Sequence, residues 1–353
     1  MNQKGFTLIE FMIALVLGMT VVLGITTLFI DSSKAVTDVN RAHRSLENSL
    51  FATDVLASEL GLIGYWGEAS APIIADHPDW GPLREHVLSD YYGFDDVPIC
   101  IGKNVSGYDT DIELAYAMEH PVASDDGSLL DLTGCSSSQT VSNTSQFVSV
   151  RRASTCAYYE GVQDCPLVEN AYYIQTNGCY IEDVLNGGEI NIRQVNSSNY
   201  ATELDFTLYG CNVTAPIYTY VVSTYFVNDQ EQLIRLYLDD DNQYKEEMLV
   251  EGVEHLSFQW FIDTDGDLEH DTVTDTLDQA DGNSIRGVKI WMVVRGLEVI
   301  PEFTDNYVYF IRGQVWDVPT GNEKYSRMLT TQMIDINPVV DVQRNQDKGK
   351  GRK

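Results

Sequence analysis

One long apolar segment near the start of the chain dominates the hydrophobic pattern. The twenty residues 11–30 contain no charged side chain. As a helix they would extend about 30 Å, which matches the thickness of the hydrocarbon core of a bilayer. The pattern therefore predicts that residues 6–30 form a membrane-spanning helix.

Beyond residue 30, apolar positions recur every three or four residues. Asp38 and Arg41, spaced i,i+3, fall on the opposite side of this pattern. The spacing predicts that the helix continues through residues 31–64 and that a globular domain covers its apolar stripe. The predicted stripe consists of Val36, Val39, His43, Leu46, Leu50, Ala57 and Leu60.

Residues 65–216 lose clear periodicity and contain every cysteine of the chain. Short strand-like runs occur at 147–152, 171–182, 190–195 and 203–209. An even number of cysteines beyond a membrane segment predicts disulfides, although six cysteines allow fifteen pairings. We expect a cysteine-rich, disulfide-stapled insertion here. Its cysteines are Cys100, Cys135, Cys156, Cys165, Cys179 and Cys211, of which Cys156 and Cys165 would close the shortest loop.

Regular β patterning begins at residue 217. Apolar, β-branched and aromatic runs at 217–227, 232–238, 246–262, 285–295, 306–316 and 325–336 are separated by turn residues. We expect residues 217–337 to form an antiparallel β-sheet domain on which the long helix packs, an α+β arrangement. Residues 338–353 carry a basic excess and are expected to form a disordered tail.

The net charge of −31 and the pI near 4.3 indicate a soluble domain outside the membrane. They argue against direct binding of nucleic acid, which requires a basic surface. The chain contains no H-E-x-x-H, G-x-S-x-G or phosphate-binding glycine loop. We therefore expect no enzymatic activity and no catalytic residues.

A short acidic run has the spacing of a cation-binding loop. Asp263, Asp265, Asp267 and Asp271 occupy its positions 1, 3, 5 and 9, from which carboxylates can surround calcium. Calcium loops need glycine at position 6, but Leu268 stands there. The alternative is a solvated acidic turn without metal, so calcium is the one possible cofactor and no other is expected.

Glu10 is an unexpected carboxylate at the start of the apolar segment. A charged side chain in the membrane costs about 3 kcal/mol and requires a partner, a proton or an interfacial position. If the chain is cut between Gly5 and Phe6, the new amine of Phe6 would lie only about 6 Å along the helix from Glu10. The same carboxylate could pair with the amine of a neighbouring chain, which would make Glu10 an assembly residue.

The sequence Gly5-Phe6-Thr7-Leu8-Ile9-Glu10, followed by the apolar helix, resembles the cleavage site of type IV prepilins. The resemblance implies that residues 1–5 are a leader, which a membrane-bound prepilin peptidase removes before Phe6 is N-methylated. A secretory signal peptide and an ordinary single-pass anchor are the alternatives. The apolar run is too long for the first, and the second does not explain Glu10.

The chain also resembles the PilW-type minor pilins, which are distant relatives of the J-type minor pseudopilins. The similar stretches are 59–67, 249–254 with 260–267, and 288–295 with 325–332. The cysteine-rich middle departs from the family pattern. The resemblance implies a type IV pilin-like fold, a periplasmic domain held by inner-membrane lipid, and later incorporation into a pilus.

This second resemblance also suggests partners and a role. The partners would be the other minor and major pilins, and the role would lie in starting or assembling type IV pili that serve twitching, adhesion or DNA uptake. Two alternatives stay open. One is a minor pseudopilin of a type II secretion system, and the other is a tip adhesin that binds through the cysteine-rich insertion.

Overall fold

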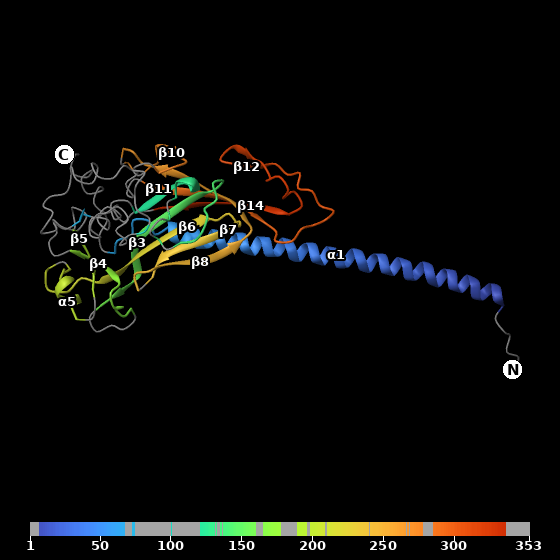
Figure 1. Cartoon of the computed structure of the whole chain (residues 1–353), viewed down its shortest axis with the longest axis horizontal. Coiled ribbons are helices and arrows are strands. Elements are labelled where there is room, and N and C mark those ends of the chain that lie inside the picture. The colour runs from blue at the N-terminus through green and yellow to red at the C-terminus, as the bar shows by residue number, and fades with distance from the viewer. Residues whose placement is uncertain are drawn as a thin grey trace, which may run out of the picture.

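A single long helix projects from a domain built of β-sheets (Figure 1). The computed structural model describes residues 7–67, 73–74, 100, 121–159, 165–177, 189–277 and 285–336, with short gaps at 131, 133–134, 136, 196–197, 209, 240, 266 and 268. Within these residues, the α+β fold expected from the sequence is confirmed.

Helix α1 spans Leu8–Leu60, a continuous run of 53 residues. Its length is about 80 Å, so one half can cross a bilayer while the other half packs on the domain. The helix begins at the N-cap Thr7 and ends at the C-cap Gly61. It stops slightly before the expected residue 64, because residues 61–64 form turns and Gly64 has a left-handed φ of 73°.

The buried face of α1 differs from the predicted apolar stripe. Val36, Val39 and Leu50 are all more than half exposed, and Leu46 is 39% exposed. His43 is also exposed and pairs with Glu47 at 3.3 Å. The residues that pack against the domain are Ser45, Ser49, Ala52, Thr53, Leu56 and Leu60. The predicted stripe is therefore confirmed at Ala57 and Leu60, which pack in the core, and wrong from Val36 to Leu50. Small side chains at Ser45, Ser49 and Ala52 let the helix approach the strands closely.

The larger sheet has eight strands, which come from both sides of residue 217. They are β1 (Ile73–Ile74), β2 (Val122–Asp126), β3 (Gln146–Tyr158), β4 (Tyr172–Asn177), β5 (Glu189–Gln194), β6 (Ile217–Val227), β7 (Gln232–Leu238) and β8 (Tyr244–Glu251). Strand β6 pairs with β3 along one edge, and with β4 and then β7 along the other. A 3-10 turn (Gly127–Leu129) and the short helix α5 (Tyr200–Glu203) connect its strands.

This arrangement shows that the boundary expected at residue 217 does not divide the β-structure. Strands β3 and β4 come from the cysteine-rich region, yet both are hydrogen-bonded to β6. The cysteine-rich region is therefore part of the main sheet, not a module appended to it.

A second sheet of four strands follows in the chain, in the order β10-β9-β11-β14. Its strands are β9 (Val253–Ile262), β10 (Thr272–Thr274), β11 (Ile285–Arg295) and β14 (Arg327–Asp335). A separate hairpin consists of β12 (Tyr309–Ile311) and β13 (Gln314–Trp316). The pairs within this sheet and the hairpin are all antiparallel.

The main hydrophobic core lies where α1 meets both sheets. Ala52, Leu56 and Leu60 of the helix pack there with Leu256 and Phe258 of β9. Side chains alternate along β11, as expected for a strand buried on both faces. Ile290, Met292 and Val294 face this core, whereas Trp291 and Val293 face the hairpin side, where they pack with Ile311.

A second core covers the other face of the larger sheet. Trp66, which follows the end of α1, stacks on Tyr220 with ring centroids 6.4 Å apart. The Cys100–Cys135 disulfide is buried in the same cluster. The residues just after α1 and the first disulfide therefore close the face of the sheet that the helix does not cover.

Candidate functional sites

The N-terminus of α1 is fixed by a reciprocal capping arrangement. The Thr7 amide donates to Glu10 Oε2 at 2.9 Å, and the Glu10 amide donates to Thr7 Oγ1 at 3.3 Å. This is a capping box, and its signal is a threonine followed three residues later by glutamate before an apolar run. The sequence reasoning singled out Glu10 but overlooked this second role. Gly5 and Phe6, the predicted processing residues, lie outside the described residues.

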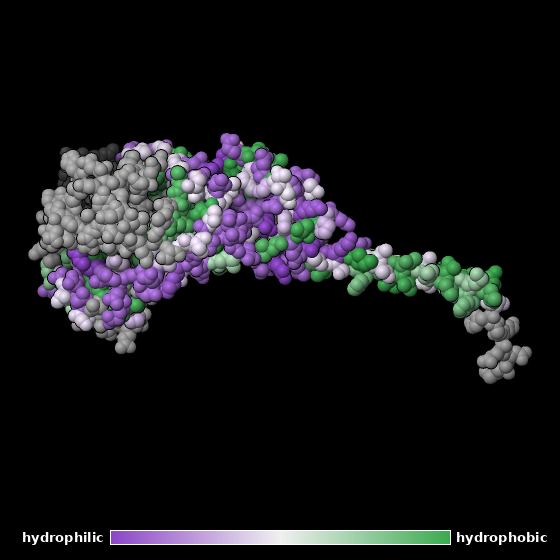
Figure 2. Space-filling model, in the orientation of Figure 1, coloured by the Kyte–Doolittle hydropathy of each residue, from purple (hydrophilic) through white to green (hydrophobic). Residues whose placement is uncertain are grey.

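The apolar half of α1 is not buried by the described part of the domain. The most apolar part of the helix is 0% buried, and its mean hydropathy of 2.5 is that of a membrane span. Figure 2 shows this green apolar rod leaving the mainly purple domain. The hydroxyl groups of Thr20, Thr26 and Thr27 donate to backbone carbonyls one turn earlier. Their polarity is therefore satisfied within the helix, as the interior of a bilayer requires.

Ion pairs fix α1 to the loop that follows β11. Arg41 Nε donates to Glu298 Oε2 at 2.8 Å, and Arg44 lies 3.8 Å from the same carboxylate. The hydrogen bond from Arg41 lowers the pKa of Glu298. One more pair, Lys34 Nζ to Glu302 Oε2 at 3.9 Å, lies further toward the apolar half. These contacts bring the loop beside residues 34–44 of α1.

The predicted cation loop brings only part of its ligand set together. Asp263, Asp265 and Asp267 each offer a carboxylate oxygen within 4.8 Å of the others. Asp263 is buried, however, and its Oδ2 already accepts two hydrogen bonds from Arg286 at 2.6 and 3.0 Å. Asp271 accepts from the amide and hydroxyl of Thr264, which lower its pKa. Calcium binding stays a prediction, and it would require Arg286 to share Asp263 with the metal.

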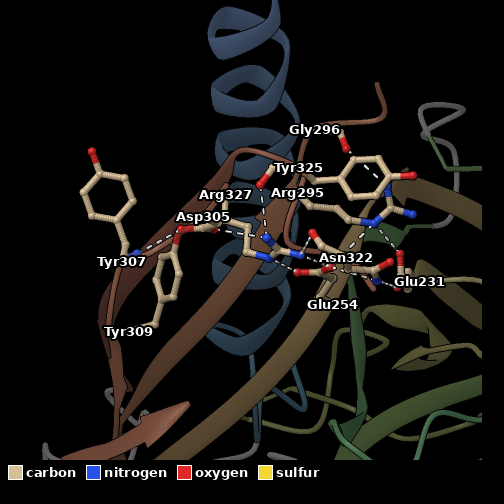
Figure 3. A network of polar contacts seen from close by, with 10 residues as sticks. All are labelled: Glu231, Glu254, Arg295, Gly296, Asp305, Tyr307, Tyr309, Asn322, Tyr325 and Arg327. Carbon is tan, nitrogen blue, oxygen red and sulfur yellow. Dashed lines mark hydrogen bonds and ion pairs between the residues drawn. The ribbon is translucent and has the colours of Figure 1, made fainter. Parts of the chain in front are cut away.

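A buried network of charged side chains ties the C-terminal loops to the second sheet (Figure 3). Arg327 of β14 is fully buried and donates to Glu254 Oε1 at 2.8 Å and to Asp305 Oδ2 at 3.0 Å. Arg295 of β11 pairs with Glu231 and lies 3.6 Å from Glu254. Glu254 is the second residue of β9, while Asp305 belongs to the loop before β12. The network therefore joins three strands, that loop and the β6–β7 turn.

The protonation of this network follows from its burial. Burial raises the pKa of Glu254, and the hydrogen bonds and charge of Arg327 oppose this change. Burial also works against the charge of Arg327, but Glu254 and Asp305 outweigh it and raise the pKa of the guanidinium. Sequence reasoning did not identify these residues, because the charges that meet here lie far apart in the chain.

Two disulfides join described cysteines. Cys100 pairs with Cys135, and Cys156 pairs with Cys165, the shortest loop expected from the sequence. Cys211 is also disulfide-bonded. Cys179 lies outside the described residues.

Comparisons with known proteins relate two parts of the chain to described families. A family described as Type IV Pilus-assembly protein W matches residues 219–337, and a prokaryotic N-terminal methylation motif matches residues 1–26. No curated protein matches the chain significantly. A type IV-like pilin from Thermus thermophilus is 10% identical over 56% of this chain and 80% of its own, with a TM-score of 0.27. So low a score supports no inference.

The methylation motif and the free apolar half of α1 define a prepilin-like protein, anchored in the inner membrane with its β-sheet domain outside. Together, the matches over residues 1–26 and 219–337 support the resemblance to type IV pilus minor pilins of the PilW type that the sequence indicated.

Proposed function

We propose that the protein is cut after Gly5, N-methylated on Phe6 and inserted through α1 into a type IV pilus, where it acts with other minor pilins in starting or capping assembly. The observation that carries this proposal is the single helix Leu8–Leu60. Its apolar half is free, and its other half is fixed to the domain. Because the domain is packed on the other half of the helix, the helix and the domain can move together from the bilayer into a filament. Prepilin peptidase and other pilins would be its partners.

The outer surface of α1 supports a place inside a bundle of helices. Val36, Val39, Leu50 and Phe51 are 52–67% exposed on the half of the helix that lies beyond the membrane. Contiguous exposed apolar side chains mark surfaces that bind other proteins. Val36, Val39 and Leu50, which the sequence pattern assigned to the domain, would thus pack against neighbouring subunits together with Phe51.

Glu10 is the proposed register residue of this assembly. In the isolated chain its carboxylate is occupied by Thr7. In a filament it would exchange this cap for the charged amine of a neighbouring Phe6, because an opposite charge attracts more strongly than a neutral donor where water is excluded.

Substitution of Glu10 tests the proposal. Glu10→Ala should leave cleavage after Gly5 intact and reduce the amount of this protein in sheared pili at least severalfold. Glu47→Ala is the matched control, since Glu47 is an exposed carboxylate on the same helix whose ion-pair partner among the described residues is His43. Pilus content equal to that of the control would contradict the role of Glu10.

Processing can be measured on the unaltered protein. Intact-protein mass spectrometry of membrane extracts should show the loss of residues 1–5 and one methyl group on Phe6. A chain that retains Met1 would overturn the proposed processing.

The alternatives from the sequence have gained no specific support. Deleting residues 68–215 would not isolate an adhesive role, because the deletion would remove β3 and β4 from the larger sheet. Cells lacking the protein can distinguish the pilus role from the secretion role, when surface pili and type II secretion are both measured. We expect them to lose surface pili and to retain type II secretion.

A further inference from the structure

The loop that follows β11 lies beside the part of α1 that leaves the membrane. Glu302 at its tip is 3.9 Å from Lys34, which stands four residues beyond the end of the uncharged segment at Ile30. Four helical residues span about 6 Å. Figure 1 shows orange-red chain between β11 and β14 reaching farthest along α1 toward the N-terminus. Within the part of the domain that the structure describes, the tip of the loop therefore lies nearest the bilayer.

The position of Lys34 and Glu302, about 6 Å beyond Ile30 along the helix, corresponds to the lipid headgroup layer. A bilayer is about 40–45 Å thick with its headgroups and about 30 Å without them, so each headgroup layer occupies roughly 5–8 Å. With Ile30 at the edge of the hydrocarbon core, Lys34 and Glu302 lie within or just above this layer.

Backbone contacts hold the loop in this position. The Ile300 amide donates to the Lys324 carbonyl at 2.9 Å, and the Asp305 amide donates to the Glu323 carbonyl at 2.7 Å. The Phe303 amide donates to the Ile300 carbonyl at 3.0 Å, which closes a turn at the tip. The backbone on both sides of the tip is thus hydrogen-bonded to residues 323–324, which holds the tip in place.

The tip combines exposed apolar side chains with carboxylates that have basic partners, and both features favour contact with a lipid surface. Val299 is 47% exposed and Pro301 is exposed, so the tip offers apolar groups. Its carboxylates face basic partners, since Glu302 lies near Lys34 and Glu298 binds Arg41. Anionic headgroups repel unpaired carboxylates and attract Lys and Arg. These pairs offset the repulsion that the carboxylates of Glu298 and Glu302 would otherwise cause.

We propose that the tip of this loop, residues 299–302, contacts the lipid headgroups of the inner membrane while the protein awaits assembly. The contact continues the membrane interface of α1, with the same lipid as its partner. It would fix the rotation of the domain about the helix, because only one side of α1 carries the loop. The membrane anchoring stated above is required for this contact, whereas the role of Glu10 is not.

A tryptophan at the tip tests the contact. The full-length protein with Val299→Trp would be placed in vesicles of phosphatidylethanolamine and phosphatidylglycerol that contain lipids brominated near the headgroup. The control is Val273→Trp in β10, which is 45% exposed and lies toward the end of the domain away from the free half of α1 (Figure 1). After subtraction of the signal from the five native tryptophans, quenching at position 299 should be at least twofold greater than at 273.

Equal quenching at the two positions would overturn the proposal. Pro301→Trp provides a second probe if the first substitution disturbs the loop, and the same difference is expected. A photoreactive amino acid at position 299 in cells should form lipid adducts. Cross-links to protein alone would show that a neighbouring subunit, and not lipid, occupies this surface.

Discussion

Arg327 shows how much of the second sheet depends on one buried side chain. Its guanidinium is fully buried between Glu254 and Asp305, which are themselves almost completely buried (Figure 3). Removing one member of a buried ion pair leaves an uncompensated charge, which typically costs 3–5 kcal/mol.

Arg327→Met should therefore lower the free energy of unfolding by about 3–5 kcal/mol, measured by denaturant unfolding in detergent. Arg44→Ala removes an arginine whose side chain is 77% exposed and should change stability by less than about 1 kcal/mol. Similar losses in the two variants would show that the network is dispensable.

The stability of the fold depends on pH through His255. Burial lowers its pKa from 6.5 to about 4, although its ring Nδ1 lies 2.7 Å from the Thr144 carbonyl, a contact that favours the charged form. Between these two pH values the unfolded chain binds a proton here that the folded chain does not. The contribution of neutral His255 is therefore complete above pH 6.5 and is lost as the pH falls toward 4.

We expect the unchanged protein to lose on the order of 2 kcal/mol more than His255→Asn between pH 7 and pH 4. Asparagine can still donate to the Thr144 carbonyl but does not titrate. Thermal unfolding across this range measures the difference, which isolates His255 from the carboxylates that titrate in both proteins. If stability fell equally with pH in the two proteins, the proposed effect of His255 would be refuted.

At the residue scale, the sequence predicted chemistry that is local and missed chemistry that needs distant partners. Glu10 stood out because a carboxylate interrupts an apolar run. Arg327 did not, because a single arginine in a strand pattern does not reveal which carboxylates the fold will bring to it. The acidic loop is an intermediate case, since its spacing was visible but the pairing of Asp263 with Arg286 was not.

Helix α1 is the element whose existence was most clear from the sequence and whose orientation was least clear. Its length and type followed from the apolar run and from the continuing period of three and four residues. Its buried face did not, because Ser45 and Ser49 are polar and were not counted as packing residues. Ser49 Oγ contacts Thr330 Oγ1 of β14, so polar side chains line part of the contact.

Two leucines on α1 test which face is buried. Leu56 is 0% exposed in the core, whereas Leu50 is 55% exposed. Leu56→Ala should destabilise the protein by about 2–5 kcal/mol, and Leu50→Ala by less than about 0.5 kcal/mol. Chemical unfolding of the two variants provides the comparison, and a larger loss for Leu50→Ala would restore the stripe predicted from the sequence.

Strand prediction succeeded where turns interrupt the apolar pattern and failed where they do not. The bounds of β6, β7 and β11 are those expected, because polar turn residues flank them. The run 246–262 was read as one strand, but Gly252 divides it into β8 and β9. Its φ of +84° redirects the chain from one sheet to the other, and a Cβ there would lie 2.6 Å from the Arg295 carbonyl. The run 203–209 contains no named strand.

One of the two described disulfides, Cys100–Cys135, acts on the whole molecule because it lies in the core opposite the helix. The Cys100–Cys135 link closes a separation of 35 residues and lies against the larger sheet, whereas Cys156–Cys165 closes only 9. In the chain-entropy model, the first should contribute about 4 kcal/mol and the second about 3 kcal/mol.

Replacing Cys100 and Cys135 together by serine should therefore lower the melting temperature more than the same change at Cys156 and Cys165. Burial strengthens this expectation, since Cys100 and Cys135 are only 2% and 1% exposed. Thermal unfolding monitored by circular dichroism compares the two double variants. The reverse order would mean that the buried link adds little to the second core.

At the scale of the whole molecule, sequence reasoning recovered the class of fold but not the way its parts are joined. Composition separated an irregular middle from a regular C-terminal part, whereas the structure places strands of both in one sheet. Pairing between β3 and β6 joins residues far apart in the chain, from Tyr158 with Ile217 to Val148 with Tyr225. No local pattern specifies such a pairing, since each strand needs only an apolar face that fits its neighbour.

The packing of one helix against strands of both sheets has a mechanical consequence. Tension on a fibre would enter each subunit along the axis of α1 and reach β8, β11 and β14 at the same time. Because these contacts share the force in parallel, the domain can slip from the helix only if many of them shear together. A pulled subunit should therefore give way at its borders with other subunits before its own sheets separate.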